Sequence, residues 1–236
     1  MSDEHTVKSF DGEINRLNDV IIEMASLTKE QVRDAVTVVV KRDSELAGEI
    51  IEKDPAINNL ELESHELTMR LLALRQPVAI DLRNIVVSIK ISSDLERIGD
   101  YAANVAKRAL VLNQLPPVKQ ARTIKNMGRV TYDLLKDVID AYEHQDVKKA
   151  LDVWHRDEEV DDMYTSIFRE LLTYMMEDTH NITACTHLLF IARNLERIGD
   201  HATNIAEDIH FMIKGKPPTG RRPMGDVDGE FDIFDH

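Results

Sequence analysis

Apolar residues recur every three or four positions along most of the chain, which is the spacing of one face of an α-helix. Near the start, Ile14, Leu17, Ile21 and Met24 follow this spacing and predict a first amphipathic helix. The same pattern predicts five more long helices, at about residues 44–75, 78–112, 118–143, 146–177 and 181–213. Gly and Pro are scarce, at 9 and 7 of 236 residues, which also favours helix over sheet. We expect an all-α protein, with Pro55 kinking or splitting the second helix.

An internal duplication organises these helices. The hexapeptide Leu-Glu-Arg-Ile-Gly-Asp occurs at residues 95–100 and again at 195–200, and a Pro-Pro pair follows each copy. Each copy holds three predicted helices, so the chain reads as two tandem three-helix bundles with six long helices in total. We place the first repeat at 1–115 and the second at 116–216. Residues 217–236 lack an apolar period and are predicted to be a disordered acidic tail.

The third helix of each copy carries a seam of apolar residues and a separate polar stripe. The apolar seam of the first copy runs from Leu95 to Leu112, and that of the second from Leu195 to Met212. Roughly opposite each seam, at i, i+4 and i+8, lie a Glu, an Asp and an Asn: Glu96, Asp100 and Asn104, then Glu196, Asp200 and Asn204. Trp154, the single tryptophan of the chain, and Phe190 are expected in the core.

Two interpretations of the polar stripes are open. Exposed charge is common on helices, so a solvated face is the plain interpretation. However, Glu and Asp at i and i+4 repel each other, and both copies keep the pair. Oxygen ligands on one stripe suit a hard or borderline cation, so the stripes are candidate metal sites. A second helix must add ligands, and Asp54, Asn58, Asp157 and Asp161 are the candidates, although a helix cap with a polar face explains them equally.

The two candidate metal sites differ in the charge around them. The first stripe continues into Lys107 and Arg108, whereas the second continues into Glu207 and Asp208. A cation near the first stripe therefore meets positive charge, and we expect the second stripe to bind cations more tightly.

Charge and composition narrow the class of protein. The formal net charge is −14, from 29 basic and 43 acidic residues, which disfavours direct binding to nucleic acid. The single cysteine, Cys185, excludes an intramolecular disulfide, and no apolar run is long enough to insert into a membrane. The first residues are polar and acidic, without the pattern of a secretory signal. We expect a cytoplasmic protein.

Several segments resemble one known family. The run from Arg75 to Arg83, the run from Ser93 to Asp100, and the following Asn104-Val105-Ala106 are similar to the signature of PhoU proteins. The opening Phe10-Asp11-x-Glu13-Ile14 also resembles the start of that family. The resemblance covers about residues 8–213, and order, spacing and duplication all agree.

The resemblance implies a fold and a function. It implies two three-helix bundles related by pseudo-twofold symmetry, a homodimer, and surface metal clusters held by paired Glu/Asp-x-x-x-Asp motifs. The metal would be a divalent cation or iron, with Fe, Mn, Mg and Zn not distinguished. It also implies a non-enzymatic role, in which the protein restrains the phosphate-starvation response by contacting a sensor histidine kinase and the ATPase of the phosphate ABC transporter.

Two other functions remain open at this point. A carboxylate-bridged di-metal enzyme needs Glu-x-x-His pairs that project into the bundle core. Glu207-x-x-His210 fits that string once, but its counterpart in the first copy, Lys107 to Leu110, does not. The other alternative is a metal-free helical interaction scaffold, in which the acidic stripes are solvated faces or docking surfaces.

Overall fold

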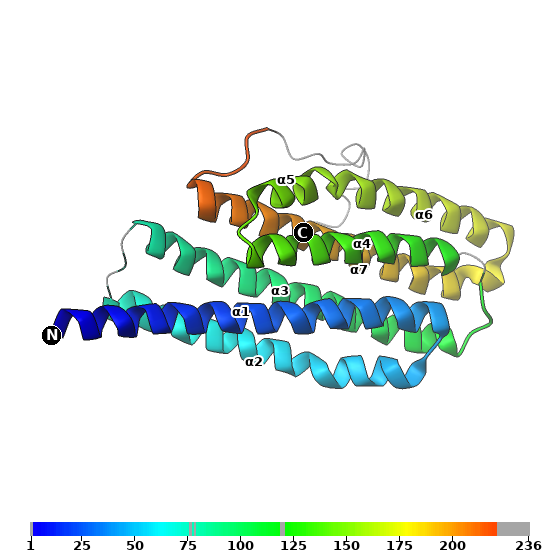
Figure 1. The fold of residues 1–236 in the computed structure, drawn as a ribbon. Helices are drawn as coiled ribbons and strands as arrows, with labels where there is room; N and C mark the ends of the chain where they lie inside the picture. Colours follow the sequence, from blue (N-terminus) through cyan, green and yellow to red (C-terminus); the bar gives the residue numbers. More distant parts are fainter. Residues whose placement is uncertain (1, 76, 78, 119–120, 221–236) are drawn as a thin grey trace.

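The structure is a computed structural model that describes residues 2–75, 77, 79–118 and 121–220, with side chains from Gly12 onward except those of Arg75 and Ala79. In the first repeat, three long helices follow one another: α1 (Ser2–Lys41), α2 (Ser44–Arg75) and α3 (Ala79–Asn113). They pack side by side as one bundle (Figure 1). Pro55 lies inside α2, which continues as one helix on both sides of it. The prediction that Pro55 could split this helix is therefore wrong.

The second repeat has the same three-helix plan with one interruption. It comprises α4 (Ala121–Glu143), α5 (Val147–His155), α6 (Asp157–Glu177), a short 3₁₀ turn (Thr179–Asn181) and α7 (Ile182–Lys214). The single helix predicted at 146–177 is therefore wrong. It breaks at Arg156, whose φ and ψ are −90° and 0°. Arg156 is held there by an ion pair with Asp137 of α4 at 2.9 Å.

The structure confirms the all-α, tandem three-helix fold, and the part of the chain that it describes contains no strand. The two repeats meet through α3 and α7, which lie against each other in the middle of the molecule (Figure 1). Three contacts give their direction: Lys90 with Asp208, Asp94 with His201, and Arg108 with Phe190. Residue numbers rise along α3 as they fall along α7, so the helices are antiparallel, as a pseudo-twofold relation requires.

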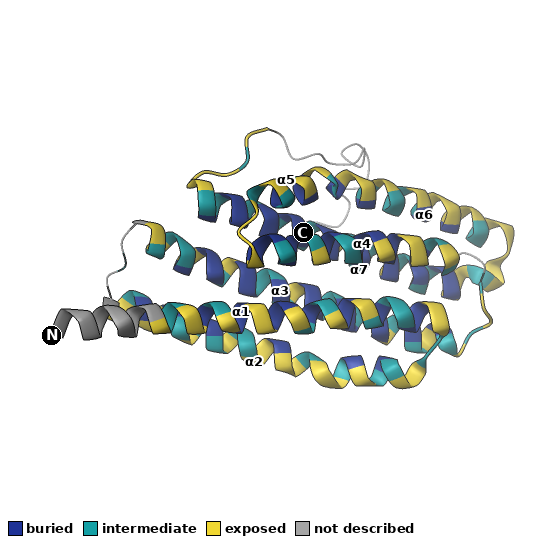
Figure 2. Cartoon of the chain, viewed as in Figure 1, coloured by how far each residue is buried: buried dark blue, intermediate teal, exposed yellow. Residues whose placement is uncertain are grey.

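The predicted apolar seams form the centre of the core. Every seam residue of both third helices is buried: Leu95, Ile98, Ala102, Val105, Ala109, Leu112, Leu195, Ile198, Ala202, Ile205, Ile209 and Met212. Figure 2 shows buried and exposed positions alternating along the helices wherever burial is described. Residues 91–106 and 191–206 have the same sequence of buried, partly buried and exposed positions. The two copies of the duplicated sequence are therefore buried in the same pattern.

The predicted repeat boundaries at 115/116 and 216/217 stay predictions. Most of the predicted tail, residues 221–236, lies outside the described residues. The chain before it is described: helix α7 ends at Gly215, whose φ of 73° is the left-handed cap that glycine favours. Gly220 then lies beside α5, where a Cβ built on it would be 3.8 Å from the Trp154 ring.

Glycines at helix contacts yield a stability prediction. A Cβ added at Gly128 of α4 would lie 2.7 Å and 2.9 Å from the two γ-carbons of Val36 in α1, and a stiff β-branched side chain cannot swing away. We expect Gly128→Ala to destabilise the protein by about 1–3 kcal/mol through overpacking. Thermal unfolding followed by circular dichroism measures the change.

The matched control is Gly199→Ala in α7. There the added Cβ would lie 3.4 Å from Val160, an ordinary contact. Its melting temperature should stay level or rise, because Ala is favoured over Gly in a helix by up to about 1 kcal/mol. Equal losses in the two variants would contradict this account of the α1–α4 contact.

Candidate metal centres

Each polar stripe lies where the third helix of a repeat crosses the second. At the first crossing, Ile57 of α2 packs on Gly99 of α3, and a Cβ at Gly99 would be only 2.9 Å from the Ile57 Cδ1. At the second, Val160 of α6 packs on Gly199 of α7 in the same way. The missing side chain lets the two helices approach closely, and the acids on either side of each glycine are brought toward the neighbouring helix. The stripes therefore lie beside a partner helix and are partly buried, with 17% of the Glu96 side chain and 38% of the Asp100 side chain exposed.

Glu96 and Asp100 of α3 form the first acidic cluster together with Asp54 and Glu61 of α2. Burial raises the pKa of Glu96, and the carboxylates of Asp100, Glu61 and Asp54 raise it further. Burial also raises the pKa of Asp100, followed by the charge of Asp54, with Arg97 and Lys107 opposing. These mutual effects place acids from both helices close enough to influence one another's charge. A site that concentrates negative charge in this way favours a cation.

Glu61 is a member of this cluster that the sequence reasoning missed. Its Oε1 accepts a hydrogen bond of 2.9 Å from the Ser93 hydroxyl of α3. Glu61 follows Asp54 by seven residues on α2, which is two helical turns, so the same spacing rule that selected the other acids would have found it.

The other residues predicted for the first site behave differently. Asp54 is held in place by Gln31 of α1, whose Nε2 donates to Asp54 Oδ1 at 2.9 Å and to the Gly99 carbonyl oxygen at 3.3 Å. Asn58 is exposed, and among the described residues no hydrogen bond joins it to the cluster. Asn104 lies one turn beyond Asp100, beside Lys107 and Arg108 in a surface pocket.

The second acidic cluster comprises Glu196 and Asp200 of α7 and Asp161 of α6. Glu196 is the most enclosed of these, with 11% of its side chain exposed. Burial raises its pKa to about 7, and the charges of Asp200 and Asp161 add to the rise, while Arg193 and Arg197 oppose it. The buried Oε2 atom of Glu196 has no hydrogen-bond partner. A buried carboxylate oxygen without a donor is costly and suits a ligand that brings positive charge.

Asp157 is the fourth residue predicted for the second site, and it lies deeper. It is 1% exposed, at the first turn of α6, and its Oδ1 accepts a hydrogen bond of 3.0 Å from the Thr203 hydroxyl of α7. The N-cap position of α6 is Arg156, without a side-chain cap hydrogen bond, so Asp157 is not the cap of this helix. Asn204 is partly buried on the same face of α7, one turn beyond Asp200.

Two substitutions between the repeats change the charge at the second cluster. Arg193 stands where the first repeat has Ser93, and its Nη1 donates to Glu196 Oε1 at 2.5 Å. Tyr164 stands where the first repeat has Glu61, and the Arg193 guanidinium lies 5.5 Å from its ring centre. The expected contrast between the stripes, drawn from Glu207 and Asp208, therefore omits a positive charge: Arg193 forms an ion pair with the central carboxylate of the second stripe.

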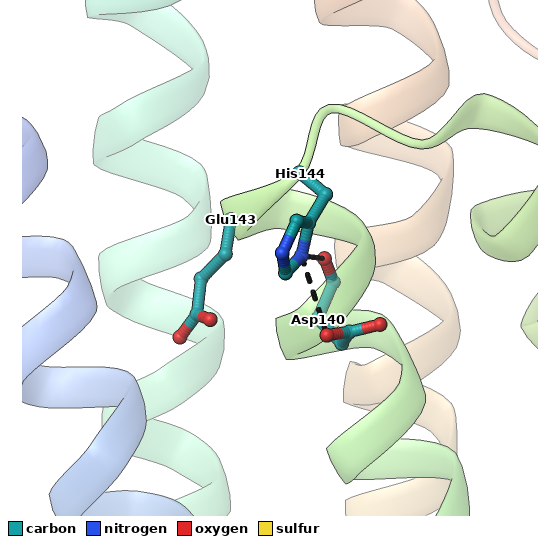
Figure 3. A group of neighbouring side chains, drawn as sticks. All are labelled: Asp140, Glu143 and His144. Atoms are coloured by element: carbon teal, nitrogen blue, oxygen red, sulfur yellow. Dashed lines mark hydrogen bonds and ion pairs between the residues drawn. The ribbon is translucent and has the colours of Figure 1, made fainter.

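A different trio is the one group of three possible ligands, among the described residues, whose donor atoms lie within 4.8 Å of one another: Asp140, Glu143 and His144 at the end of α4 (Figure 3). Lys149 bonds to Asp140 and lowers the pKa of that carboxyl. His144 Nδ1 lies 2.9 Å from the Asp140 backbone oxygen and 3.3 Å from its Oδ1. Glu143 and His144 are exposed, and Asp140 already forms ion pairs with His144 and Lys149. We therefore interpret the trio as ion-paired side chains at the end of α4 and not as a metal site.

The pair considered for a di-metal enzyme makes other bonds. Glu207 Oε1 accepts a hydrogen bond of 2.8 Å from the Trp154 ring nitrogen. His210 Nδ1 lies 2.8 Å from the Lys216 backbone oxygen, where the chain leaves α7. Trp154 is buried as expected, but the expectation for Phe190 is wrong, because its side chain is 46% exposed.

None of the helices in the described residues is both long enough and apolar enough to cross a membrane. The fold and the two acidic clusters define a protein of tandem three-helix bundles with an acid-lined helix crossing in each repeat. The chain belongs to the PhoU domain family, which matches residues 21–109 and 124–209, one match in each repeat.

Named relatives cover nearly the whole chain. A phosphate-specific transport system accessory protein PhoU homolog of Caulobacter vibrioides is 50% identical over 225 residues, which are 95% of this chain and 98% of the relative. A protein of the same name from Xylella fastidiosa is 50% identical over 213 residues, 90% of this chain and 88% of the relative. The crystal structure of PhoU from Pseudomonas aeruginosa has a TM-score of 0.86 at 38% identity and covers 88% of this chain and 100% of its own.

The raised pKa of Glu196 predicts a pH dependence of stability in the metal-free protein. A carboxyl whose pKa is raised on folding, here from 4.5 to about 7, stabilises the folded state at low pH. That contribution, about 3 kcal/mol at most, is lost as pH rises from about 4.5 through 7. We expect Glu196→Gln to flatten the fall in melting temperature between pH 5 and 8, measured with a chelator present.

The control for this measurement is Glu143→Gln, because Glu143 is exposed. It should keep the pH slope of the unmodified chain. If Glu196→Gln and Glu143→Gln show the same slope, the carboxyl of Glu196 is not the group responsible.

Proposed function

We propose that the chain is a non-enzymatic regulatory adaptor of phosphate transport. In this role it restrains the phosphate-starvation response by contacting a sensor histidine kinase and the ATPase of the phosphate ABC transporter. The observation that carries the proposal is likeness over nearly the full chain, at 50% identity, to relatives named as phosphate-specific transport system accessory proteins. Both repeats take part in that likeness, so the whole double bundle is the functional unit.

The charge of the chain supports action through proteins. With a net charge of −14 the surface repels phosphodiester backbones, so regulation of genes must pass through a partner that binds DNA or controls one that does. A histidine kinase and a transporter ATPase are both reached from the cytoplasm, which is the compartment we propose. A homodimer, with two copies of the acidic surface, belongs to the same proposal.

We further propose that the acidic clusters hold a divalent cation or iron. In the first cluster the ligands are Glu96, Asp100, Asp54 and Glu61; in the second they are Glu196, Asp200 and Asp161. The raised pKa values of Glu96, Asp100 and Glu196 support this, since burial and neighbouring carboxylates disfavour the charged form of each. A bound cation would supply the missing positive charge and hold the second and third helices of a repeat together. Oxygen ligands alone suit Fe, Mn, Mg or Zn to differing degrees.

The pathway prediction concerns a deletion strain. Without this chain, phosphate-uptake genes should be expressed several-fold above the wild-type level when phosphate is plentiful, because the restraint on the kinase is gone. A transcriptional reporter fused to such a gene measures the effect. Removal of the kinase in the same strain should abolish it. Normal repression in the deletion strain would contradict the assigned role.

The metal prediction ranks the two clusters in the reverse order to that expected from the sequence. Arg193 already neutralises Glu196, so the second cluster should bind cations more weakly than the first by roughly tenfold. Titration of the purified protein with Mn²⁺ or Fe²⁺, with elemental analysis, measures this. The variant Glu96→Gln with Asp100→Asn should lose the tighter binding, and Arg193→Ser should strengthen the weaker one.

The control for the titration is Asp140→Asn with Glu143→Gln, which alters the exposed trio on α4 without touching either cluster. It should leave both affinities unchanged. Loss of metal in this control alone would move the site to α4. Absence of metal from every form of the protein would favour the metal-free interaction scaffold.

A further inference from the structure

A surface pocket of about 320 Å³ lies between the second half of α3 and the first half of α7, and neither acidic cluster explains it. Six residues line it: Asn104, Lys107, Arg108 and Val111 of α3, with Phe190 and Asn194 of α7. Two cations, two amides and two apolar groups face one hollow. In a chain with a net charge of −14, a pocket without an acidic lining residue is unusual.

Among the described residues, the two cations of this pocket have no acidic partner within ion-pair distance, although the charge of Lys107 acts on Asp100 from the edge of the first cluster. Neither Lys107 nor Arg108 forms an ion pair with any residue that the structure describes. Arg108 lies over the Phe190 ring, with its guanidinium carbon 4.4 Å from the ring centre. Phe190 and Val111 nevertheless remain 46% and 38% exposed. The pocket therefore presents positive charge next to uncovered apolar surface.

Pseudo-twofold symmetry provides a comparison for this pocket. The position equivalent to Arg108 is Asp208, and the position equivalent to Phe190 is Lys90. There Lys90 and Asp208 form an ion pair of 3.0 Å. Beside it Asp94, the equivalent of Asn194, pairs with His201 at 2.7 Å. The equivalent place thus has its charges balanced by carboxylates of the chain itself, whereas the pocket at Arg108 lacks them.

We propose that the acidic segment 225–236 of this same chain docks into the Lys107–Arg108 pocket. The segment reads Gly-Asp-Val-Asp-Gly-Glu-Phe-Asp-Ile-Phe-Asp-His, with five acids and no Lys or Arg. Its carboxylates match the two cations, and Phe231 or Phe234 matches the exposed apolar wall. The segment thus provides an acidic partner for the cations and an apolar partner for the exposed wall.

The length of the chain permits this contact. Gly220 lies beside Trp154, and the Trp154 ring nitrogen bonds to Glu207 of α7. From Glu207 to Phe190 is 17 residues of helix, or about 26 Å. An extended chain from Gly220 spans about 36 Å to Phe231 and about 46 Å to Phe234. The surplus lets the segment pass around α7 to reach the pocket.

Tethering favours this occupant over a separate acidic molecule. A segment joined by a short linker has an effective concentration of the order of millimolar at its site, so a few weak contacts suffice. A free acidic peptide or a second copy of the chain must instead approach a molecule of net charge −14 from dilute solution. The docked segment would cover the pocket until a competing partner displaces it.

The first test measures protection of the segment in the full chain. Chymotrypsin cleaves after Phe231 and Phe234, and mass spectrometry follows the rate. With Lys107→Gln and Arg108→Gln together, cleavage should be about fivefold faster, because proteolysis tracks the undocked fraction. The same increase is expected when Asp226, Asp228, Glu230 and Asp232 are changed to Asn or Gln, a variant that leaves the bundle untouched.

The matched control is Arg122→Gln with Lys125→Gln, which removes two exposed cations from α4. It should cleave at the rate of the unmodified chain. High salt should speed cleavage of the unmodified chain and leave the Lys107/Arg108 variant little changed. If the pocket variant and the α4 control cleave at the same rate, the proposal is overturned.

A second measurement identifies the occupant. A fluorescent peptide of residues 224–236 should bind the chain truncated after Gly220, and bind the full chain about fivefold more weakly, because the native segment competes. Equal binding to both chains, or none to the truncated chain, overturns the proposal. So does self-association that the pocket variant abolishes while cleavage stays unchanged, since a second copy would then be the occupant.

Discussion

The antiparallel contact between α3 and α7 is the constraint on which the rest of the structure depends. These two helices carry the duplicated hexapeptide, and they form the junction between the repeats as well as the inner wall of each bundle. Because each is packed on several sides, the face away from its apolar seam is not left to solvent. In the first repeat that face meets α2 at Gly99 and Ile57; in the second it meets α6 at Gly199 and Val160. The acidic residues beside these glycines are thereby enclosed, and their carboxylates lose part of their hydration.

Partial burial disfavours the charged form of these carboxylates, and the two repeats place different groups beside them. Partly desolvated carboxylates next to one another raise each other's pKa, and a cation is the most direct compensation. In the second repeat a side chain supplies it, since Arg193 binds Glu196. Even so, burial dominates, the pKa of Glu196 stays raised, and its Oε2 has no hydrogen-bond donor. In the first repeat Ser93 takes the place of that arginine and donates only a neutral hydrogen bond to Glu61. The acids there have Arg97 and Lys107 at their edge but no cation in hydrogen-bond contact.

Apolar periodicity and duplication were sufficient to predict most of the helices, the seams and the acid pairs that each third helix carries, because these are properties of a single helix or a repeated one. Residues were mispredicted where the outcome depends on contacts between helices. Glu61 fits the helical spacing on α2, but its place beside Glu96 depends on the crossing of α2 and α3 at Gly99. Arg193 stands three residues before Glu196 on the same helix, and a pattern of acids and amides does not select it. The break at Arg156 depends on an acid of α4, Asp137, and so a continuous apolar period hid it. Phe190 has core-like chemistry, yet α3 presents Arg108 to it in place of an apolar surface.

The two repeats share the same pattern of buried positions but differ in their charged residues. The difference lies in which of these charges are paired within the molecule. Burial along residues 91–106 and 191–206 is the same at every position, so a core substitution in one repeat is constrained as in the other. On the polar faces, the second repeat contributes acids that pair within the molecule: Glu196 with Arg193, Asp208 with Lys90 and Glu207 with Trp154. The equivalent positions of the first repeat leave acids clustered at α2 and cations uncovered at Lys107 and Arg108. Charges that a fold does not satisfy cost stability and persist where a ligand, a partner or another segment satisfies them. We therefore propose the first repeat as the half of the molecule that binds a cation and a further segment or partner.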